Sequence, residues 1–165
     1  MQEAARFHVR EPEPADAEAI ARVQVATWQA TYGSLLPSSY FDATALEQRT
    51  AMWRSVLNGL HRPPRLRVAE THGDIVGFAA AGPPIEDDDP VRDLQLYTLY
   101  LLPEHHGSGA GQLLLDAVLV GEPAQLWVAE DNPRAHSFYR RNGFMPDGTE
   151  KIFPHAPLVA VRLVR

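Results

Sequence analysis

Cysteine is absent from this chain of 165 residues, which excludes a disulfide framework, a zinc ribbon and a cysteine nucleophile. Lysine is almost absent, because only Lys151 among the 15 basic residues is not an arginine, and we attribute this bias to genome composition. Acidic residues are in excess, with 21 Asp and Glu and a formal net charge of −6. The chain therefore lacks the overall positive charge typical of nucleic-acid-binding domains, and we expect no nucleic-acid partner.

Apolar runs of signal-peptide or membrane-spanning length are also missing from the sequence. The longest apolar stretches fall far short of the roughly 20 residues that a membrane-spanning helix needs. We therefore expect a cytoplasmic protein without a membrane partner. The length fits one folded unit and no linker or repeat divides the chain, so the sequence predicts a single domain over residues 1–165.

The pattern of apolar residues predicts an α+β fold. Short alternating runs indicate strands, and longer runs with apolar residues three and four apart indicate helices. The order β-α-α-β-β-β-α-β-α-β-β predicts a mostly antiparallel central sheet flanked by helices. We expect strands over 6–10, 65–70, 75–81, 94–102, 125–129, 149–153 and 158–164, and helices over about 17–32, 45–58, 110–120 and 133–142.

Turn and cap signals indicate where these elements end. Thr44 and Glu47 have the spacing of a capping box at the start of the second helix. His72, Gly73 and Asp74 form a turn of hairpin length. In the third helix, the periodicity predicts inward-facing side chains at Leu113, Leu114, Ala117 and Val118.

The loop over residues 82–93 carries three consecutive aspartates, Asp87, Asp88 and Asp89. Adjacent carboxylates in a loop are more often solvated charge than a metal site. We therefore expect solvated charge in this loop and no metal cofactor.

A glycine-rich turn joins the strand over 94–102 to the helix that follows it. Gly107, Gly109 and Gly111 stand at alternate positions, where they permit positive φ and close approach of a ligand to the backbone. Successive N–H groups at a helix N-terminus form an anion site, although glycines also serve a plain turn. No Lys-Ser/Thr pair follows Gly111, which excludes a nucleotide-hydrolysing P-loop. A dinucleotide fold would need the glycines after its first strand.

The second informative stretch predicts a strand and then a helix, with Asn132 as N-cap and Pro133 as the first helical residue. Ala135, Phe138 and Tyr139 are spaced three and four residues apart, so they share one helix face. Taken alone, this pattern indicates a capping asparagine and two core aromatic residues.

Together, the two stretches resemble the two signature motifs of the GCN5-related N-acetyltransferase (GNAT) superfamily. The first resembles its acetyl-CoA loop, Gln/Arg-x-x-Gly-x-Gly/Ala, at His106, Gly109 and Gly111. The order and spacing agree over about residues 65–165, and the stretch from Trp28 to Pro37 resembles the start of bacterial members. The resemblance implies the GNAT fold and an acetyl-CoA-dependent N-acetyltransferase that acts on a primary amine. The second motif, Asn-x-x-Ala-x-x-Phe-Tyr-x-x-x-Gly-Phe, is matched at Asn132, Ala135, Phe138, Tyr139, Gly143 and Phe144.

The resemblance implies a site for acetyl-CoA as co-substrate. The pantetheine arm would pair with the backbone of Leu99, Tyr100 and Leu101, like an added strand. The pyrophosphate would lie on the N–H groups of the glycine turn. Further cofactor contacts are expected at His106, Gly107, Ser108, Gly109, Ala110, Gly111, Gln112, Asn132 and Tyr139, with Arg134, Arg140 or Arg141 as candidates near the phosphates.

The resemblance also implies the chemistry. Without a cysteine for an acyl-enzyme, the amine is expected to attack the thioester directly in a ternary complex. Tyr139 would give its proton to the departing thiolate. Gln95 stands where many relatives place a glutamate as general base, and glutamine cannot accept a proton at neutral pH. A base must therefore lie elsewhere, or a chain of water molecules must replace it.

Trp28 and Tyr32, one helical turn apart, are expected to wall the acceptor pocket. The acidic loop and the net charge favour a cationic acceptor, either a small-molecule amine such as a polyamine or aminoglycoside, or a peptide N-terminus. The alternative to an enzyme is a catalytically weak acyl-CoA-binding sensor or regulatory module. The C-terminal ribbon over Leu158–Val164 is a candidate for strand pairing across a homodimer.

Overall fold

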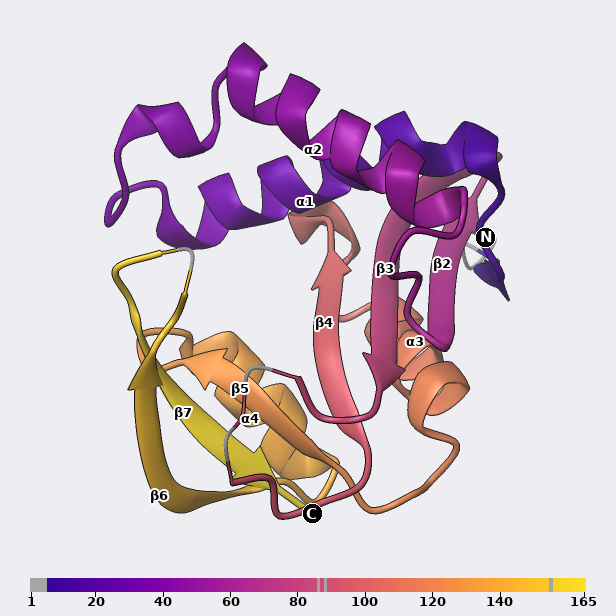
Figure 1. Cartoon of the computed structure of the whole chain (residues 1–165). Helices are drawn as coiled ribbons and strands as arrows, with labels where there is room; N and C mark the ends of the chain where they lie inside the picture. Colours follow the sequence, from indigo (N-terminus) through magenta and orange to yellow (C-terminus); the bar gives the residue numbers. More distant parts are fainter. Residues whose placement is uncertain (1–5, 86, 88, 155) are drawn as a thin grey trace.

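In the computed structural model, which describes residues 6–85, 87, 89–154 and 156–165, a seven-stranded sheet lies between two layers of helices (Figure 1). The strand order is β1-β2-β3-β4-β5-β7-β6, and only the pair β4–β5 is parallel. The strands are β1 (His8–Arg10), β2 (Arg65–Thr71), β3 (Asp74–Gly82), β4 (Gln95–Leu101), β5 (Gln125–Ala129), β6 (Met145–Ile152) and β7 (Val159–Val164). The helices are α1 (Ala17–Tyr32), α2 (Ala43–Leu57), α3 (Ala110–Leu119) and α4 (Pro133–Arg141), with single turns η1 (Pro14–Asp16), η2 (Ser38–Tyr40) and η3 (Pro103–His105).

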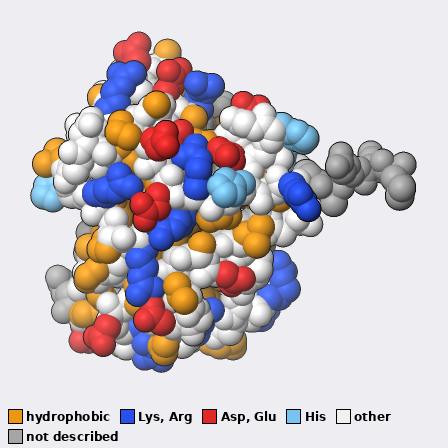
Figure 2. Space-filling model, turned by 90° about the vertical axis from the view of Figure 1, so that its right-hand side faces the viewer, with side chains coloured by type: hydrophobic (Ala, Val, Ile, Leu, Met, Phe, Trp, Pro, Cys, Tyr) orange, Lys and Arg blue, Asp and Glu red, His pale blue; other side chains and the backbone are white. Residues whose placement is uncertain are grey.

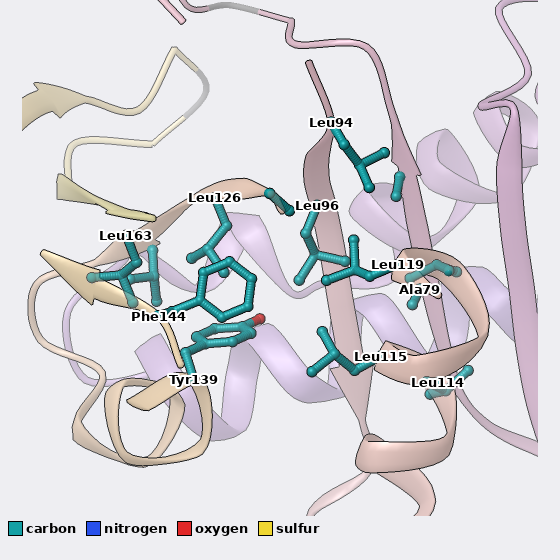
Figure 3. Packing of buried hydrophobic residues seen from close by; sticks show 14 of the residues in the cluster. Ala79, Leu94, Leu96, Leu114, Leu115, Leu119, Leu126, Tyr139, Phe144 and Leu163 are labelled. Carbon is teal, nitrogen blue, oxygen red and sulfur yellow. The ribbon is translucent and has the colours of Figure 1, made fainter. Parts of the chain in front are cut away.

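Two of the clusters of buried hydrophobic residues lie on opposite faces of the sheet. Helices α1 and α2 pack on one face, where the rings of Trp53 and Phe78 meet edge-on at 5.2 Å between centroids. Helices α3 and α4 pack on the other face, where Leu115 and Phe144 are almost completely buried (Figure 3). Phe78 and Ala79 are neighbours on β3 but belong to different cores, because successive side chains of a strand point to opposite faces. Within the described part of the chain, no helix has the length and hydropathy needed to cross a membrane.

The surface beside β1 and β2 carries charges of both signs. Figure 2 shows basic and acidic side chains interspersed over this face. Arg10 pairs there with Asp16 at 2.8 Å and with Glu70 at 3.1 Å. The side chains of these pairs are partly buried, and the alternation of charge leaves this face without a large field of one sign.

Local sequence signals determine one hairpin turn and the start of one helix. The hairpin β2–β3 closes through His72 and Gly73, both with positive φ (51° and 84°), which confirms the predicted turn at these two residues. Asp74, predicted as part of the turn, is the first residue of β3 and pairs with Thr71. The predicted capping box at Thr44 is wrong, because Asp42 is the N-cap of α2 and accepts the N–H of Ala45 at 2.8 Å. Aspartate is a stronger N-cap than threonine, so the helix begins two residues earlier.

The inward face of α3 differs from the predicted one by part of a turn. Leu114 and Val118 are buried as expected, but Leu113 is 46% exposed and Leu115 takes its place in the core. Ala110, at the first position of the helix, is fully buried and sets this rotation. Three consecutive leucines contain no information on which of them faces the sheet, so the sequence pattern alone left the phase open.

Strand β7 lies between β5 and β6 and pairs antiparallel with both. Both of its edges are therefore used within the chain, so Leu158–Val164, the candidate for strand pairing across a homodimer, has no open edge for it. An apolar strand pattern predicts that a strand is buried, but it does not say which strands are its neighbours.

The expectation that the aspartates of the loop over residues 82–93 are solvated is wrong for Asp87. Its side chain is only 5% exposed and pairs with Arg162 on β7 at 3.3 Å, and it accepts the side-chain amide of Gln125 at 2.7 Å. Arg162 also pairs with Asp147 on β6 at 2.6 Å. Asp89 is exposed as expected, whereas Asp88 lies outside the described residues. The basic partner of Asp87 is far away in the sequence, where local charge patterning gives no sign of it.

Replacing Asp147 with asparagine is expected to lower the free energy of unfolding at neutral pH by about 1 kcal/mol and to reduce acid sensitivity. Although burial alone would raise the pKa of Asp147, hydrogen bonds from the Thr149 N–H and from Arg162 hold it below its usual value. A carboxyl with a lowered pKa stabilises the fold above its unfolded pKa near 4, and this stabilisation is lost as the pH falls. Urea unfolding at pH 6.5 and at about pH 3, below the unfolded pKa, measures both effects. Equal acid losses in the parent chain and in Asp147→Asn would contradict the prediction.

Strands β4 and β5 are paired only where they begin. Gln95 and Leu96 are opposite Gln125 and Leu126, and beyond these residues the two strands diverge (Figure 1). Strand β4 stays paired with β3 as far as Leu101. The edge of β4 that faces β5 thus finds no strand partner over its second half among the described residues, which opens the sheet at its centre.

Candidate functional site

A cavity of about 940 Å³ lies where β4 and β5 diverge. Its walls come from these two strands, the C-terminal half of α1, the glycine turn before α3, and α4. As far as the described residues form it, the lining does not include Ser108 or Ala110, two of the predicted cofactor contacts. The predicted site residues that do line it are Trp28, Tyr32, Gln95, Leu99, Tyr100, Leu101, His106, Gly107, Gly109, Gly111, Gln112, Asn132 and Tyr139.

The register of β4 directs the backbone of Leu99 and Leu101 into the gap. Leu102 donates its N–H to Val76 of β3 at 2.9 Å. In antiparallel pairing, successive residues point their N–H and C=O groups to opposite sides of the strand. Leu101 and Leu99 therefore face β5, whereas the backbone of Tyr100 faces β3. Of the three residues expected to pair with a bound arm, two have the backbone orientation for it.

The glycine turn has the conformation that only glycine adopts easily. Gly107 and Gly109 have φ of 77° and 93°, and Gly109 is the N-cap of α3. A Cβ added at either glycine would have no protein atom within 4 Å. These glycines therefore leave space beside the first N–H groups of α3 and do not relieve a clash within the protein. Ala110 does not line the cavity, because its side chain is buried in a cluster with Val76 and Leu101. Its N–H bonds to the hydroxyl of Ser108 at 3.3 Å.

His106 ties the glycine turn to the end of β4. Its Nε2 lies 3.0 Å from the carbonyl oxygen of Leu101. A carbonyl oxygen only accepts, so Nε2 is the protonated, donating nitrogen. The imidazole thus occupies the carbonyl oxygen of Leu101. The N–H of Leu101 remains the backbone group that this residue directs into the gap.

Tyr139 on α4 is 7% exposed and lines the cavity. Its ring packs edge-on against Phe138 and Phe144, with centroids 5.3 and 5.8 Å away. Figure 3 shows its hydroxyl pointing from α4 toward β4. Burial, and then the nearby hydroxyls of Tyr100 and Tyr32, raise the pKa of Tyr139 well above its ordinary value. The phenol therefore stays protonated throughout the neutral range and is available as a proton donor.

Two hydrogen bonds connect α1 to the rest of the site. Trp28 donates its indole N–H to the hydroxyl of Tyr100 at 2.9 Å, and the amide of Asn132 donates to the hydroxyl of Tyr32 at 3.4 Å. The rings of Trp28 and Tyr32 lie 5.0 Å apart and wall the cavity together. The Asn132 carbonyl also accepts the N–H of Ala135 at 3.2 Å, which confirms its predicted capping role.

Gln95 is 5% exposed at the start of β4 and lines the cavity. Its side-chain oxygen accepts the N–H of Ile85 at 3.1 Å. The contact holds the loop between β3 and β4 against the strand. Since an amide does not accept a proton at neutral pH, Gln95 has the geometry of a positioning residue.

Among the lining residues that the prediction from the sequence missed are Trp127 on β5, Lys151 on β6, and Phe153 just after β6. The Lys151 ammonium lies 4.3 Å from the centroid of the Trp127 ring, a cation–π distance. The only sequence signal for this site was that Lys151 is the single lysine. Two of the predicted phosphate candidates, Arg134 and Arg141, also line the cavity.

The arrangement fits an elongated ligand with amides along its length and phosphates at one end. The open edge of β4 offers hydrogen-bonding groups to the amides. The N-terminus of α3 offers N–H groups and the positive end of a helix dipole to the phosphates. Arg134 and Arg141 add positive charge to the same cavity. The amides and the phosphates of such a ligand would therefore each have a partner.

Comparison with known proteins gives a concordant result. The model of a family described as acetyltransferase (GNAT) domain matches residues 62–146. YuaI from Bacillus subtilis, described as an uncharacterized N-acetyltransferase, is 32% identical over 132 residues, which are 76% of this chain and 73% of YuaI. Rv2669 from Mycobacterium tuberculosis, with the same description, is 36% identical over 119 residues, which are 68% of this chain and 69% of Rv2669.

Solved structures share the fold along nearly the whole chain. The PaiA N-acetyltransferase from Thermoplasma acidophilum, in complex with coenzyme A, superposes with a TM-score of 0.70 at 20% identity and covers 97% of this chain and 99% of its own. PH1933 from Pyrococcus horikoshii gives 0.71 at 18% identity and covers 97% and 98%. At these identities the likeness concerns the fold alone.

Proposed function

Because the chain belongs to the GNAT family of acyltransferases, we propose that it transfers an acetyl group from acetyl-CoA to a primary amine by direct attack in a ternary complex. The observation that carries the proposal is that the open edge of β4, the glycine turn and Tyr139 all line one cavity. We propose further that residues 1–165 act as one domain.

The cofactor arm would lie along β4, with its amides hydrogen-bonded to the backbone of Leu99 and its thioester carbonyl next to the N–H of Leu101. The N–H groups of Gly107, Gly109, Gly111 and Gln112, which line the cavity, would hold the pyrophosphate, with Arg134 and Arg141 alongside. The net charge of −6 works against an anionic cofactor, so this local arrangement must supply the attraction. When bound, acetyl-CoA would supply an activated acetyl thioester.

In the transfer, a carbon–nitrogen bond forms to the amine as the carbon–sulfur bond breaks. The Leu101 N–H would stabilise the carbonyl oxygen as it gains negative charge. Tyr139 would protonate the departing thiolate, and the proton lost by the amine, carried by water, would restore the phenol. Gln95 would keep the loop in place without taking a proton. The products are an acetamide and the free thiol of coenzyme A.

The test is a thiol-release assay with acetyl-CoA and a panel of primary amines and peptide N-termini, together with calorimetric titration of acetyl-CoA. We expect binding and an amine-dependent release of thiol. Binding without release for any acceptor would instead favour an acyl-CoA-binding sensor, a reading supported by the amide of Gln95 at the position of a base. A chain that bound ATP or NAD but not acetyl-CoA would overturn both functions.

A further inference from the structure

We propose that the acceptor amine also carries a carboxylate, as an amino acid does, and that Lys151 binds this carboxylate. This inference rests on the proposed acetyltransferase function and names its substrate class. It narrows the expected cationic acceptors to those that also carry a carboxylate, because the charge of Asp87 in the acidic loop is already paired with Arg162.

An acidic side chain contacts the described lining, because Asp87 accepts the indole N–H of Trp127 at 3.3 Å, but its charge is already paired with Arg162. The described residues that line the cavity include no aspartate or glutamate. Asp87, from the acidic loop, is paired with Arg162 and bonded to Gln125. Each ammonium of a polyamine that leaves water needs an anionic or polar partner. The described lining provides no carboxylate for that purpose.

The acceptor end of the cavity lies on the α1 side of the sheet. Leu126 and Val128 of β5 belong to the core beneath α3 and α4, so Trp127 between them points to the opposite face. Phe153 packs on that same side against the cluster that contains Trp28. Trp28, Trp127 and Phe153, which form the aromatic wall of the cavity, are therefore on the face away from the phosphate-binding turn.

Lys151 brings a positive charge to this wall. Its ammonium lies over the ring of Trp127, and both residues line the cavity. A long, flexible lysine can swing from a ring face to a ligand carboxylate and form a charge-assisted hydrogen bond. An amine whose carboxylate contacts Lys151 would thus be held by a charge that a simple alkylamine cannot use.

A second cation borders the same wall. The guanidinium of Arg49 on α2 lies 5.9 Å from the ring centroid of Trp28. Its Nη1 is buried and has no hydrogen-bond partner among the described residues. Arg49 lines a separate hollow of about 320 Å³, so we assign the contact to Lys151. The charge of Arg49 adds to the positive potential at this end.

The same charges would assist the reaction. The acceptor must lose its proton before it attacks, and no described carboxylate of the lining is available as a base. A neighbouring cation disfavours a protonated amine and lowers its pKa. A zwitterionic acceptor satisfies both needs, because its carboxylate is attracted to Lys151 while its ammonium is encouraged to release a proton.

Matched acceptor pairs test the proposal. L-phenylalanine and phenylethylamine, and L-leucine and isoamylamine, differ only in the carboxylate. We expect kcat/KM to be about tenfold higher for the amino acid, and Lys151→Met to abolish this preference by raising KM for the amino acid alone. Lys151→Arg, which keeps the charge, should retain it. Preference for the simple amines or for spermidine, or equal losses for both members of each pair in Lys151→Met, would overturn the proposal.

Arg22→Gln is the control for charge. It removes one positive charge from the exposed surface of α1, where Arg22 pairs with Glu18, and should leave both acceptors unaffected. Thermal unfolding of each variant verifies that the fold is kept.

A binding measurement separates this inference from the proposed activity. If no amine is turned over, the acetyltransferase proposal fails, but N-acetyl-L-phenylalanine and N-acetylphenylethylamine can still be titrated in the presence of coenzyme A. Trp28 and Trp127 line the cavity, so tryptophan fluorescence reports occupancy. We expect about tenfold tighter binding of the carboxylate ligand, lost in Lys151→Met. Equal affinities, or no binding of either ligand, would count against the carboxylate site.

Discussion

Replacing Tyr139 with phenylalanine is expected to lower kcat by about ten- to a hundredfold while the affinity for acetyl-CoA is largely kept. Only the hydroxyl is removed, and the ring retains its edge-on contacts with Phe138 and Phe144. The hydroxyl is the group proposed to protonate the departing thiolate, so its loss acts on the transition state and not on cofactor binding. Thiol release at saturating substrates gives kcat, and calorimetry gives the affinity.

The pH profile provides an independent readout of the same role. Because burial and neighbouring hydroxyls raise the pKa of Tyr139, its donating form persists as the pH rises past the ordinary phenol pKa near 10. We therefore expect no alkaline decline of kcat below about pH 10 from this group. Tyr40→Phe removes a phenol hydroxyl outside the cavity lining and should leave kcat unchanged. Full turnover in Tyr139→Phe would exclude the residue from the proton transfer.

The fold could be predicted from the sequence wherever the signal is local. The hairpin through His72 and Gly73 needs positive φ at consecutive residues, and a glycine beside a turn-forming residue predicts such a hairpin. The sequence was less informative where several registers satisfy the same pattern. The leucines at the start of α3 fit more than one rotation of the helix, and only burial of Ala110 against the sheet selects the observed one.

The candidate site likewise has parts that local sequence predicts and parts that depend on strand order. The residues of the glycine turn are close together in the sequence, and so are those of the helix from Asn132 to Tyr139. The spacing within each segment could therefore be recognised from the sequence. Lys151 and Trp127 meet only because β6 follows the outer edge of β7 while β5 diverges from β4. The pair of Asp87 and Arg162 likewise joins a loop to a distant strand. Strand order creates such contacts, and no local periodicity encodes them.

Replacing Gly109 with alanine is expected to weaken acetyl-CoA binding by about a hundredfold, which equals the loss of one or two hydrogen bonds to a charged group. Gly109 has φ of 93° at the N-cap of α3. An alanine there is strained by about 1 kcal/mol. Relief of this strain would rotate the turn and misdirect the first N–H groups of the helix. No protein atom lies within 4 Å of the added Cβ, so the fold itself should survive.

Gly121→Ala is the matched control for that strain. Gly121 follows α3 with φ of 72°, also has no protein atom within 4 Å of an added Cβ, and does not belong to the described cavity lining. Both variants should lose similar stability in thermal unfolding, but only Gly109→Ala should lose affinity in calorimetric titration. S-acetylpantetheine lacks the pyrophosphate, so its binding should be nearly equal in the two variants. A loss shared by acetyl-CoA and S-acetylpantetheine would assign Gly109 to the cavity's shape instead of to the phosphates, because the N–H groups of α3 act only on the charged end of the cofactor.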